Sequence, residues 1–510
     1  MAVEPRTLAG METRQSSPAP ALLRVLGPWT ATAIVVGTII GSGIFKKPQD
    51  VADRVPYFGL AIGVWVVGGL LTLLGALALG EVAVLFPRAG GNYVFLREGF
   101  GRRTGFLWGW VEFWIIRGAS LAALATIFAE SLRDVLVNPA LRRWLGLPVA
   151  GNEFGFWPLR GLTVAVLVVL ALVNVRGVRW GGYLQLVVTV VKVATLVGIM
   201  VLPFAVCWLA APVAAAAQPT TDHWSPIWPE DWAAVSWGQV GAALVGVLFA
   251  YHGWMNVAPV AEEVRSPQRN LPRALLLGSG IVLVLYVGAN LAYYLVIPRP
   301  EMAMMKESPV STEFSLRLLG PIGAAVASAA VMMSTFGALN GNLLVGPRVI
   351  FAMGDDGLAP RFLAAIHARF HTPSVAILVT ATWSAILVLA VALLTELGAL
   401  KAGKNHFNIL TDFAMFGAVC FETLAVATIF VFRRRLPQVP RPYRCPGYPV
   451  VPFLYVVVLA AVLVNMFWQQ THEALIGLGF IALGAVVYPL MNSPRIAAAD
   501  RSRPMGFPAG

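Results

Sequence analysis

Long apolar runs separated by short polar stretches dominate the chain, and they define the elements that the sequence predicts. A helix needs about 20 apolar residues to cross roughly 30 Å of hydrocarbon. The runs are continuously apolar and do not alternate as the strands of a membrane barrel do, so they predict helices. We predict an all-α polytopic membrane protein with twelve spans at approximately 28–53, 58–86, 105–133, 159–175, 180–209, 236–263, 272–297, 321–353, 373–395, 406–432, 450–468 and 473–491.

Composition and charge agree with this interpretation. Hydrophobic residues make up 58% of the chain and charged residues only 12%, whereas a soluble protein carries roughly 25% charged residues. The net charge of +12 is typical of the basic loops of membrane proteins, so we expect a lipid bilayer and no nucleic acid as partner. The pattern predicts an N-terminal tail at 1–27, a transmembrane domain at 28–491 and a C-terminal tail at 492–510.

The loops differ in charge between the two sides of the predicted membrane domain. With twelve spans, both termini lie on one side, and the loops of that side hold about twice as many Arg and Lys residues as the opposite loops. The cluster Arg433-Arg434-Arg435 contributes most to this bias. Residues 1–23 contain no apolar core of a signal peptide. We therefore expect a multi-pass protein of the plasma or inner membrane with both termini in the cytoplasm.

Two spans are interrupted, and the interruptions lie five helices apart. The first span breaks at Gly41-Ser42-Gly43, and the sixth breaks within Phe249–Trp254. In lipid, an unwound backbone is tolerated only where it lines a cavity. A five-helix repeat inverted in the membrane brings two such breaks together at the bilayer midplane. Helices 1–5 and 6–10 are therefore expected to form inverted repeats, with helices 11 and 12 appended.

The broken backbone offers the chemistry that a zwitterion requires. Free amides after the first break stand at a helix N-terminus and suit a carboxylate, whereas free carbonyls before it suit an ammonium. The aromatic residues of the sixth span fit a pocket wall. Tight packing of small residues and of aromatic rings is the alternative for the two segments. His252 either titrates near neutral pH or shapes the pocket, and we favour the second role.

Charged residues inside the spans need partners, because a charge in hydrocarbon is costly. Lys192 lies mid-span and is interpreted as a fixed cation in place of a sodium ion, a proton-sensitive switch or a structural pin. Glu112 and Arg117 are off the helical i,i+4 spacing, so they form a structural pair or find partners on other helices. Glu262 and Glu263, at the exit of the sixth span, are gate residues or solvated end charges.

The sequence contains no pattern of an enzyme or a metal site. It has no metal-ligand cluster, no GxSxG motif and no Walker loop. Its three cysteines, Cys207, Cys420 and Cys445, do not suit a disulfide framework. We expect no cofactor, no metal and no catalytic activity. A channel would need a filter or a ring of polar pore residues, and none is evident.

Motifs along nearly the whole membrane region resemble those of the amino acid–polyamine–organocation (APC) superfamily, and most closely its L-type amino-acid transporter (LAT) branch. The first break and the sixth-span segment FAYxGW are part of this resemblance. The matching segments are VGTIIGSGIF at 36–45, FPRAGGNY at 86–93, VEFWIIR at 111–117, FAYHGW at 249–254, Glu262-Glu263, Asn270-Leu-Pro272, FGALNG at 336–341, PRPY at 440–443 and GYPV at 447–450.

The resemblance implies a LeuT-type fold with discontinuous helices 1 and 6. It implies that amides at Ser42 and Gly43 hold the substrate carboxylate, that carbonyls at Ile39, Phe249 and His252 hold the amino group, and that the Phe249 ring acts as an outer gate. Our candidate substrate-binding residues are Ile39, Gly41, Ser42, Gly43, Phe249, His252, Gly253, Trp254 and Met255.

The same resemblance gives Lys192 the place of a sodium ion, in contact with spans one and eight, with Ser334 and Thr335 as its neighbours. Two departures bear on the substrate: His252 stands where the branch usually has Gly, and Met255 stands where the large-neutral carriers have Asn. Residues 134–160 contain no Cys, whereas animal members use a cysteine there to bind a heavy chain. We therefore expect no disulfide-linked heavy chain, as in bacterial members.

These expectations combine into a sodium-independent secondary transporter of L-amino acids that works by alternating access and exchanges its substrates. Neutral amino acids are favoured because no Asp or Glu lies in either break, and cationic substrates usually require a carboxylate. Proton symport through Lys192 or His252 is one alternative. A carrier of cationic amino acids or polyamines is the other.

Overall fold

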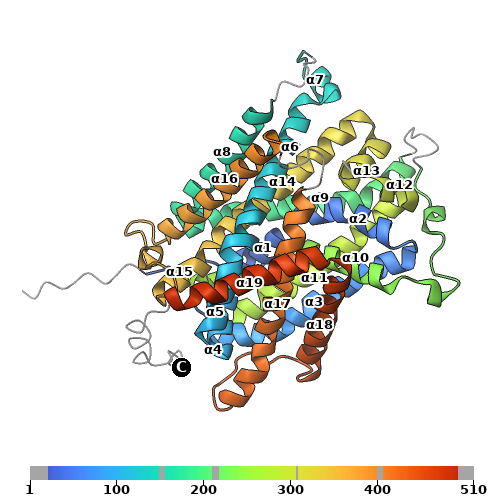
Figure 1. Cartoon of the computed structure of the whole chain (residues 1–510). Coiled ribbons are helices and arrows are strands. Elements are labelled where there is room, and N and C mark those ends of the chain that lie inside the picture. The colour runs from blue at the N-terminus through green and yellow to red at the C-terminus, as the bar shows by residue number, and fades with distance from the viewer. Residues whose placement is uncertain (1–20, 149–154, 210–217, 306–307, 399–405, 492–510) are drawn as a thin grey trace, which may run out of the picture.

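The computed structural model describes residues 21–148, 155–209, 218–305, 308–398 and 406–491, and among residues 406–414 only the backbone. The chain forms a bundle of long helices (Figure 1). Within the described residues there is no strand, only an isolated bridge between Leu26 and Val264. The predicted all-α membrane fold is confirmed.

The first half of the bundle consists of two helices separated by a short break and of longer helices after them. Its elements are α1 (Pro28–Ile39), α2 (Gly43–Arg54), α3 (Phe58–Leu85), α4 (Asn92–Phe100), α5 (Arg102–Val111), the π-helix η1 (Glu112–Arg117), α6 (Gly118–Val137), α7 (Pro139–Trp144), α8 (Phe156–Val175) and α9 (Val178–Trp208).

The second half begins with another short helix followed by an irregular segment. Its elements are η3 (Thr221–Trp224), η4 (Trp232–Ala234), α10 (Trp237–Tyr251), η5 (Ala258–Glu263), α11 (Pro267–Val296), α12 (Arg299–Met304), α13 (Val310–Leu319), α14 (Pro321–Val345), α15 (Pro347–Asp355), η6 (Arg361–Ala364), α16 (Ser374–Glu396), α17 (His406–Arg435), α18 (Val450–Gln469) and α19 (Thr471–Met491).

Proline fixes the start of many of these helices. Its ring sets φ near the helical value, and its missing N–H is not needed in the first turn. In the part of the chain that the structure describes, five helices have proline as their first residue: Pro28, Pro139, Pro267, Pro321 and Pro347.

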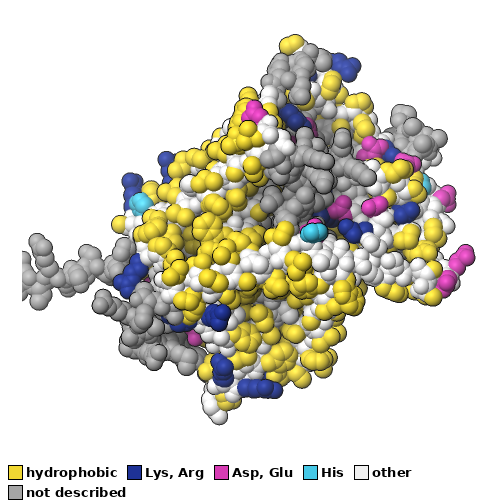
Figure 2. All heavy atoms as spheres, viewed as in Figure 1, with side chains coloured by type: hydrophobic (Ala, Val, Ile, Leu, Met, Phe, Trp, Pro, Cys, Tyr) yellow, Lys and Arg dark blue, Asp and Glu magenta, His cyan; other side chains and the backbone are white. Residues whose placement is uncertain are grey.

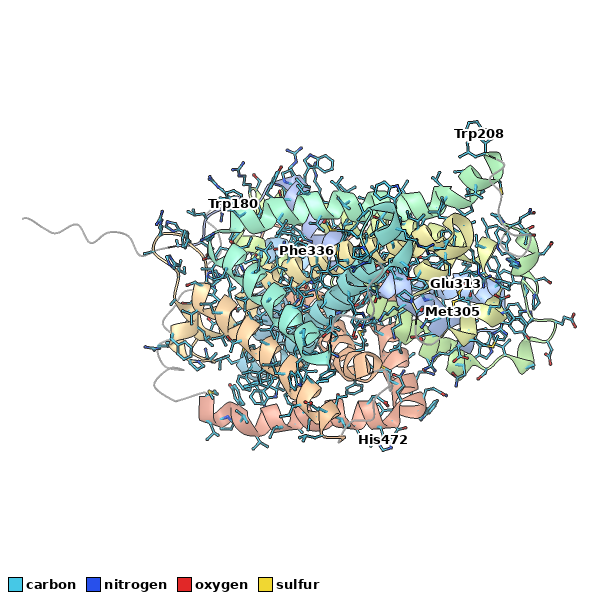
Figure 3. The ribbon with its side chains drawn as sticks, turned by 90° about the horizontal axis from the view of Figure 1, so that it is seen from above. Trp180, Trp208, Met305, Glu313, Phe336 and His472 are labelled. Atoms are coloured by element: carbon cyan, nitrogen blue, oxygen red, sulfur yellow. The ribbon has the colours of Figure 1, made fainter. Side chains whose placement is uncertain are left out.

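Helices of the first half pack against their counterparts in the second half. α3 packs along α11, α6 along α14, and α8 along α16. Trp180 and Trp208 mark the two ends of α9 along one side of the bundle, and α19, which begins near His472, lies along the opposite side (Figure 3). These pairs join the second with the seventh, the third with the eighth and the fourth with the ninth predicted span, so counterparts in the predicted inverted repeat lie in contact.

The number of spans differs from the predicted twelve. In the described chain, ten helices are long and apolar enough to cross a membrane, and the bent pair α1–α2 makes eleven. α10 has only 15 residues, because the predicted span 236–263 is interrupted and continues as the 3₁₀ helix η5. Twelve is reached only if α10 and η5 count as one broken span.

The outer surface matches a protein embedded in lipid. Figure 2 shows a broad apolar face over the helices, with Lys and Arg side chains gathered near the end that carries α4 and α15. Large exposed apolar side chains line α9 and α16, including Val190, Phe204 and Leu389. Such a continuous apolar surface is stable only in a bilayer.

Candidate functional site

The first break separates α1 from α2 by Ile40, Gly41 and Ser42, one residue earlier than predicted, and bends the span by about 40°. Glycine is a poor helix former, so Gly41-Ser42-Gly43 is where the span can open. Gly43 is also required by packing, since a Cβ built there would lie 2.8 Å from the Cα and Cβ of Ala250 on α10. The close approach of α2 and α10 therefore depends on this residue.

The second break follows α10 and contacts the first. His252 is extended (φ −59°, ψ 145°), and Gly253 has φ +102°, a conformation that L side chains rarely adopt. The Thr38 hydroxyl on α1 contacts the Gly253 carbonyl at 3.1 Å and the Ile34 carbonyl of its own helix at 2.6 Å. The two interrupted segments, more than 200 residues apart in the chain, are thus joined directly.

A cavity of about 530 Å³, its open mouth included, lies between the two breaks. This size suits a small-molecule ligand. Its wall is formed by α1 and α2, α6, the end of α10, the turn after it and α14. The lining residues are Thr38, Ile39, Gly41, Ser42, Gly43, Ser120, Ala123, Leu124, Phe249, Ala250, His252, Gly253, Asn256, Ala338 and Asn342.

Residues of the breaks line this cavity, and several of their backbone groups can accept or donate a further hydrogen bond. Among the described residues, the amides of Gly41, Ser42 and Gly43 have no backbone acceptor. The Ile39 carbonyl accepts from the Tyr286 hydroxyl at 3.0 Å, which leaves its second lone pair for another donor. Amides at the start of α2 and a carbonyl at the end of α1 can therefore bind a carboxylate and an ammonium, respectively.

Lys192 of α9 holds the broken end of α1. Its Nζ donates to the carbonyls of Gly37 at 2.7 Å and Ile40 at 2.5 Å. The Ser334 hydroxyl on α14 joins them, donating to Gly41 O at 2.9 Å. The Thr335 hydroxyl instead donates to carbonyls of its own helix. An ammonium thus binds the backbone carbonyls that the break leaves without helical partners.

Phe249 lines the cavity near a second, polar cavity of about 470 Å³ that residues of α2 and α10 line. Lys47 lines this second cavity, and its Nζ lies 5.6 Å from the centre of the Phe249 ring. Lys47 also pairs with Asp50 at 2.9 Å. The Phe249 ring is therefore a wall of the first cavity that also contacts a charged residue of the second.

Two predicted binding residues do not line the cavity. Trp254 packs edge-on against Tyr455 of α18, and the sulfur of Met255 contacts Asn92 of α4. Both side chains are buried. Their neighbours Gly253 and Asn256 line the cavity, so within this irregular turn only Trp254 and Met255 face other helices.

Glu112 and Arg117 lie together because their segment is a π-helix. The i→i+5 hydrogen bonds of a π-helix bring residues five apart onto one face, and Arg117 Nε donates to Glu112 Oε1 at 2.9 Å. Arg117 also contacts Oδ1 of Asn342 and, at 3.4 Å, Oδ1 of Asn256. We predicted either a local pair with Glu112 or partners on other helices for Arg117, and the structure contains both.

His252 has a partner that the sequence analysis missed. Its Nδ1 lies 2.8 Å from Oε1 of Glu422 on α17. The two atoms are at ion-pair distance but are not aligned for a linear hydrogen bond. Although neither break contains an acid, a buried carboxylate thus stands beside a residue of the cavity wall.

The end of the bundle that carries residue 21 is closed by a second group of contacts. Glu263 and Arg348 form a fully buried pair, with Nε and Oε1 2.9 Å apart. The Glu263 carbonyl accepts from the amides of Val25 and Leu26 at 2.9 Å. Glu262 accepts from the amide of Ala89 at 3.1 Å. The acids at the exit of the sixth span therefore tie α15 and neighbouring loops together and are not solvated end charges.

Asn256, Asn342 and Glu422 were not among the predicted site residues. A polar or charged residue in an otherwise apolar span is by default a functional candidate, and this signal could have found Glu422. Asn342 directly follows the segment FGALNG, and Asn256 stands two positions after FAYHGW. Their contact with Arg117 could not be inferred from spacing alone.

Comparisons with known proteins agree with this geometry. The family model described as amino acid permease matches residues 26–488. The serine/threonine exchanger SteT of Bacillus subtilis (strain 168) is 30% identical over 465 residues, covering 90% of this chain and 95% of that protein.

Two mammalian proteins are similar to the same extent. The large neutral amino acids transporter small subunit 2 of Homo sapiens is 31% identical, covering 92% of this chain and 80% of that protein. The Asc-type amino acid transporter 1 of Mus musculus is 29% identical, covering 92% of this chain and 81% of that protein. The chain therefore belongs to the amino acid permease family of the APC superfamily and is an LAT-like member of it.

Proposed function

We propose that this protein is a sodium-independent secondary transporter that exchanges neutral L-amino acids by alternating access. The observation that carries the proposal is the cavity between the two breaks, where amides of Ser42 and Gly43 and the carbonyl of Ile39 are available to a zwitterion. Lys192 supports sodium independence, because its ammonium already binds the carbonyls of Gly37 and Ile40. The site is built for binding, and we expect no enzymatic activity.

The test is exchange in proteoliposomes that contain the purified chain. Uptake of labelled alanine, serine or leucine is expected to rise strongly when unlabelled amino acid is present inside. Replacing sodium by choline is expected to leave the rate unchanged. Uptake that is indifferent to internal substrate would refute exchange, and uptake that needs sodium would refute the role given to Lys192.

Proton symport is the second candidate function, because His252 lines the cavity and Lys192 binds carbonyls of the first break. It predicts accumulation against a gradient that collapses with an uncoupler. It also predicts that Lys192→Ala or a His252 variant loses the pH dependence of uptake. Unchanged pH dependence in either variant rules out that residue as the coupling group.

We further propose that the carrier works without a disulfide-linked heavy chain and with both termini in the cytoplasm. Residues 134–160 contain no Cys, and the basic cluster at 433–435 favours the cytoplasm for the end of α17. Activity of the purified chain alone would support the first point. Labelling of a cysteine introduced at Arg24 only in inverted vesicles would support the second.

A further inference from the structure

α2 begins at the first break and α10 ends at the second, and the two helices pack side by side (Figure 1). Each step along α2 away from the break is matched by an equal step back along α10. The pair is therefore antiparallel and keeps one register over about three turns. The contacts that show this register join Gly43 with Ala250, Lys47 with Gly246, and Arg54 with Gln239.

Both cavities lie along this helix pair. On α2, Gly43 lines the first cavity, whereas Lys47 and Asp50 line the second. On α10, Ala250 lines the first cavity and Gly246 lines the second. Residues four or seven positions apart share one face of a helix. A rise of 1.5 Å per residue places the two cavities about 10 Å apart along α2, so the second cavity lies on the same groove as the proposed substrate site.

The two helices give the second cavity walls of different character. The α10 wall consists of the small residues Ala242, Ala243 and Gly246, whereas the α2 wall carries charged side chains of both signs. Within the α2 wall, Lys47 and Asp50 form an ion pair at 2.9 Å. These two charges compensate each other, so a ligand of the cavity is left with the other polar groups.

Three other groups of this cavity have bonding capacity that the described chain does not use. Arg54 donates to Gln239 at 3.1 Å and has no carboxylate partner among the described residues, although a guanidinium has five N–H donors. Asp53 has no cationic partner in the same part of the chain. Oε1 of Gln470 is buried and accepts no hydrogen bond from a described residue. A buried acceptor without a donor is costly, and an ammonium ligand supplies a donor.

We infer that the second cavity is a further binding site for an α-amino acid, in which Arg54 binds the carboxylate and Asp53 with Gln470 binds the ammonium. Side chains hold the ligand here, whereas backbone groups hold it in the first cavity. The inference rests on the proposed function and adds a second site for the same class of substrate.

The charges of the cavity favour a zwitterion over a simple ion. A lone anion on Arg54 would lie close to the carboxylate of Asp53, and a lone cation on Asp53 would lie close to the guanidinium. A zwitterion complements both groups at once, and the planar guanidinium matches its carboxylate in a bidentate contact. Because the α10 wall is small and apolar, we expect binding to depend on both charges of the ligand and little on its side chain.

The test is the number of amino-acid molecules that the purified full chain binds. Equilibrium dialysis with labelled leucine over a wide concentration range is expected to give two sites per chain. Isoamylamine and 4-methylpentanoic acid each keep the side chain of leucine and one of its two charges. Neither compound is expected to displace leucine from the second site, and displacement by either one would show that the site does not recognise a zwitterion.

Variants of the two charged residues identify the second site. Arg54→Gln and Asp53→Asn are each expected to weaken it about 10- to 100-fold, the value of one hydrogen bond to a charged group. Arg54→Lys keeps the charge without the fork and is expected to give an intermediate affinity. Arg143→Gln removes an exposed cation on α7 and is the matched control, which keeps two sites. Asp53 is exposed, so Asp53→Asn keeps the test available if Arg54→Gln does not fold.

A variant of the first cavity separates the two sites. Ala123 lines that cavity from α6, and Ala123→Trp fills it with a ring. This variant is expected to lose exchange and one bound leucine, and the leucine that remains is expected to be lost in Ala123→Trp/Arg54→Gln.

Two results would overturn the inference and leave the proposed function standing. They are a single leucine per chain that Ala123→Trp removes, and two sites that persist in both Arg54→Gln and Asp53→Asn. A single site that Arg54→Gln removes and Ala123→Trp does not would instead support the second site and contradict the first. Absence of exchange by the wild type in proteoliposomes refutes the proposed function alone, because the number of bound leucine molecules is measured without transport.

Discussion

Gly43 shows how a single missing side chain shapes the substrate cavity. A Cβ at this position would lie 2.8 Å from the Cα and Cβ of Ala250, and a well-packed helix pair cannot absorb such a contact without moving apart. Gly43→Ala is therefore expected to separate α2 from α10 and to lower the exchange rate at least about tenfold, as measured in proteoliposomes.

The control for this substitution is Gly63→Ala on α3, where a Cβ has no neighbour within 4 Å. This variant should exchange amino acids at the wild-type rate and unfold at the same or a slightly higher temperature, because alanine is the better helix former. A Gly43→Ala protein as active as the Gly63→Ala protein would show that the close approach is not needed.

The residues of the backbone site could be predicted because their signal is local. Glycine and serine weaken a helix wherever they stand, so the sequence alone points to the break at Gly41-Ser42-Gly43. Trp254 and Met255 could not be judged this way, since their direction depends on the irregular turn that contains them. Glu422 comes from a helix 170 residues further along the chain than His252, and no spacing rule connects the two.

At the scale of the element, the π-helix η1 decides what Arg117 can do. In a regular α-helix, residues five apart point in different directions, whereas here Arg117 reaches Glu112 and two cavity asparagines at once. Removing one partner of a buried ion pair leaves a charge without compensation. Arg117→Ala is therefore expected to lower the free energy of unfolding by about 3–5 kcal/mol.

The double substitution Glu112→Ala/Arg117→Ala tests whether the uncompensated charge of Glu112 causes the destabilisation. It removes the stranded carboxylate as well, so it should be less destabilising than Arg117→Ala alone. Thermal unfolding of four purified proteins in one detergent provides the comparison: the wild type, Glu112→Ala, Arg117→Ala and the double variant. A double variant as unstable as the sum of both single variants would mean that the two charges do not interact.

The helices themselves were largely predictable, because their apolar runs are long, but their irregular turns were not. The sequence predicts one continuous span across residues 105–133, and the structure inserts the π-helix within it. The spacing of Glu112 and Arg117 was unusual for an α-helix, and this anomaly was the only visible sign. A π-turn depends on tertiary contacts of its side chains, here with α14 and with the turn after α10.

At the scale of the whole molecule, the two ends differ in the contacts that close them. The end that carries residue 21 is closed by the buried pair Glu263–Arg348, by the bridge between Leu26 and Val264, and by the bond from Tyr93 to Asp356 at 2.8 Å. The second, polar cavity lies instead near Phe249, between charged residues of α2 and small residues of α10. Alternating access requires the first group of contacts to break when the cavity opens to that end.

Arg348→Ala should therefore favour the state that is open at the end carrying residue 21. The substitution leaves Glu263 as a buried charge without its partner, and hydration of that charge is possible only if α15 and η5 separate. The measurement uses Ser120→Cys, a cavity position, in a background without native cysteines. A thiol reagent that cannot cross membranes is added from either side of sealed vesicles. Labelling from the Arg348 side should rise several-fold in Arg348→Ala, whereas Arg434→Ala, which removes an exposed cation at the same end, should leave it unchanged. Equal labelling in both variants would mean that the Glu263–Arg348 pair holds the fold together without controlling access to the cavity.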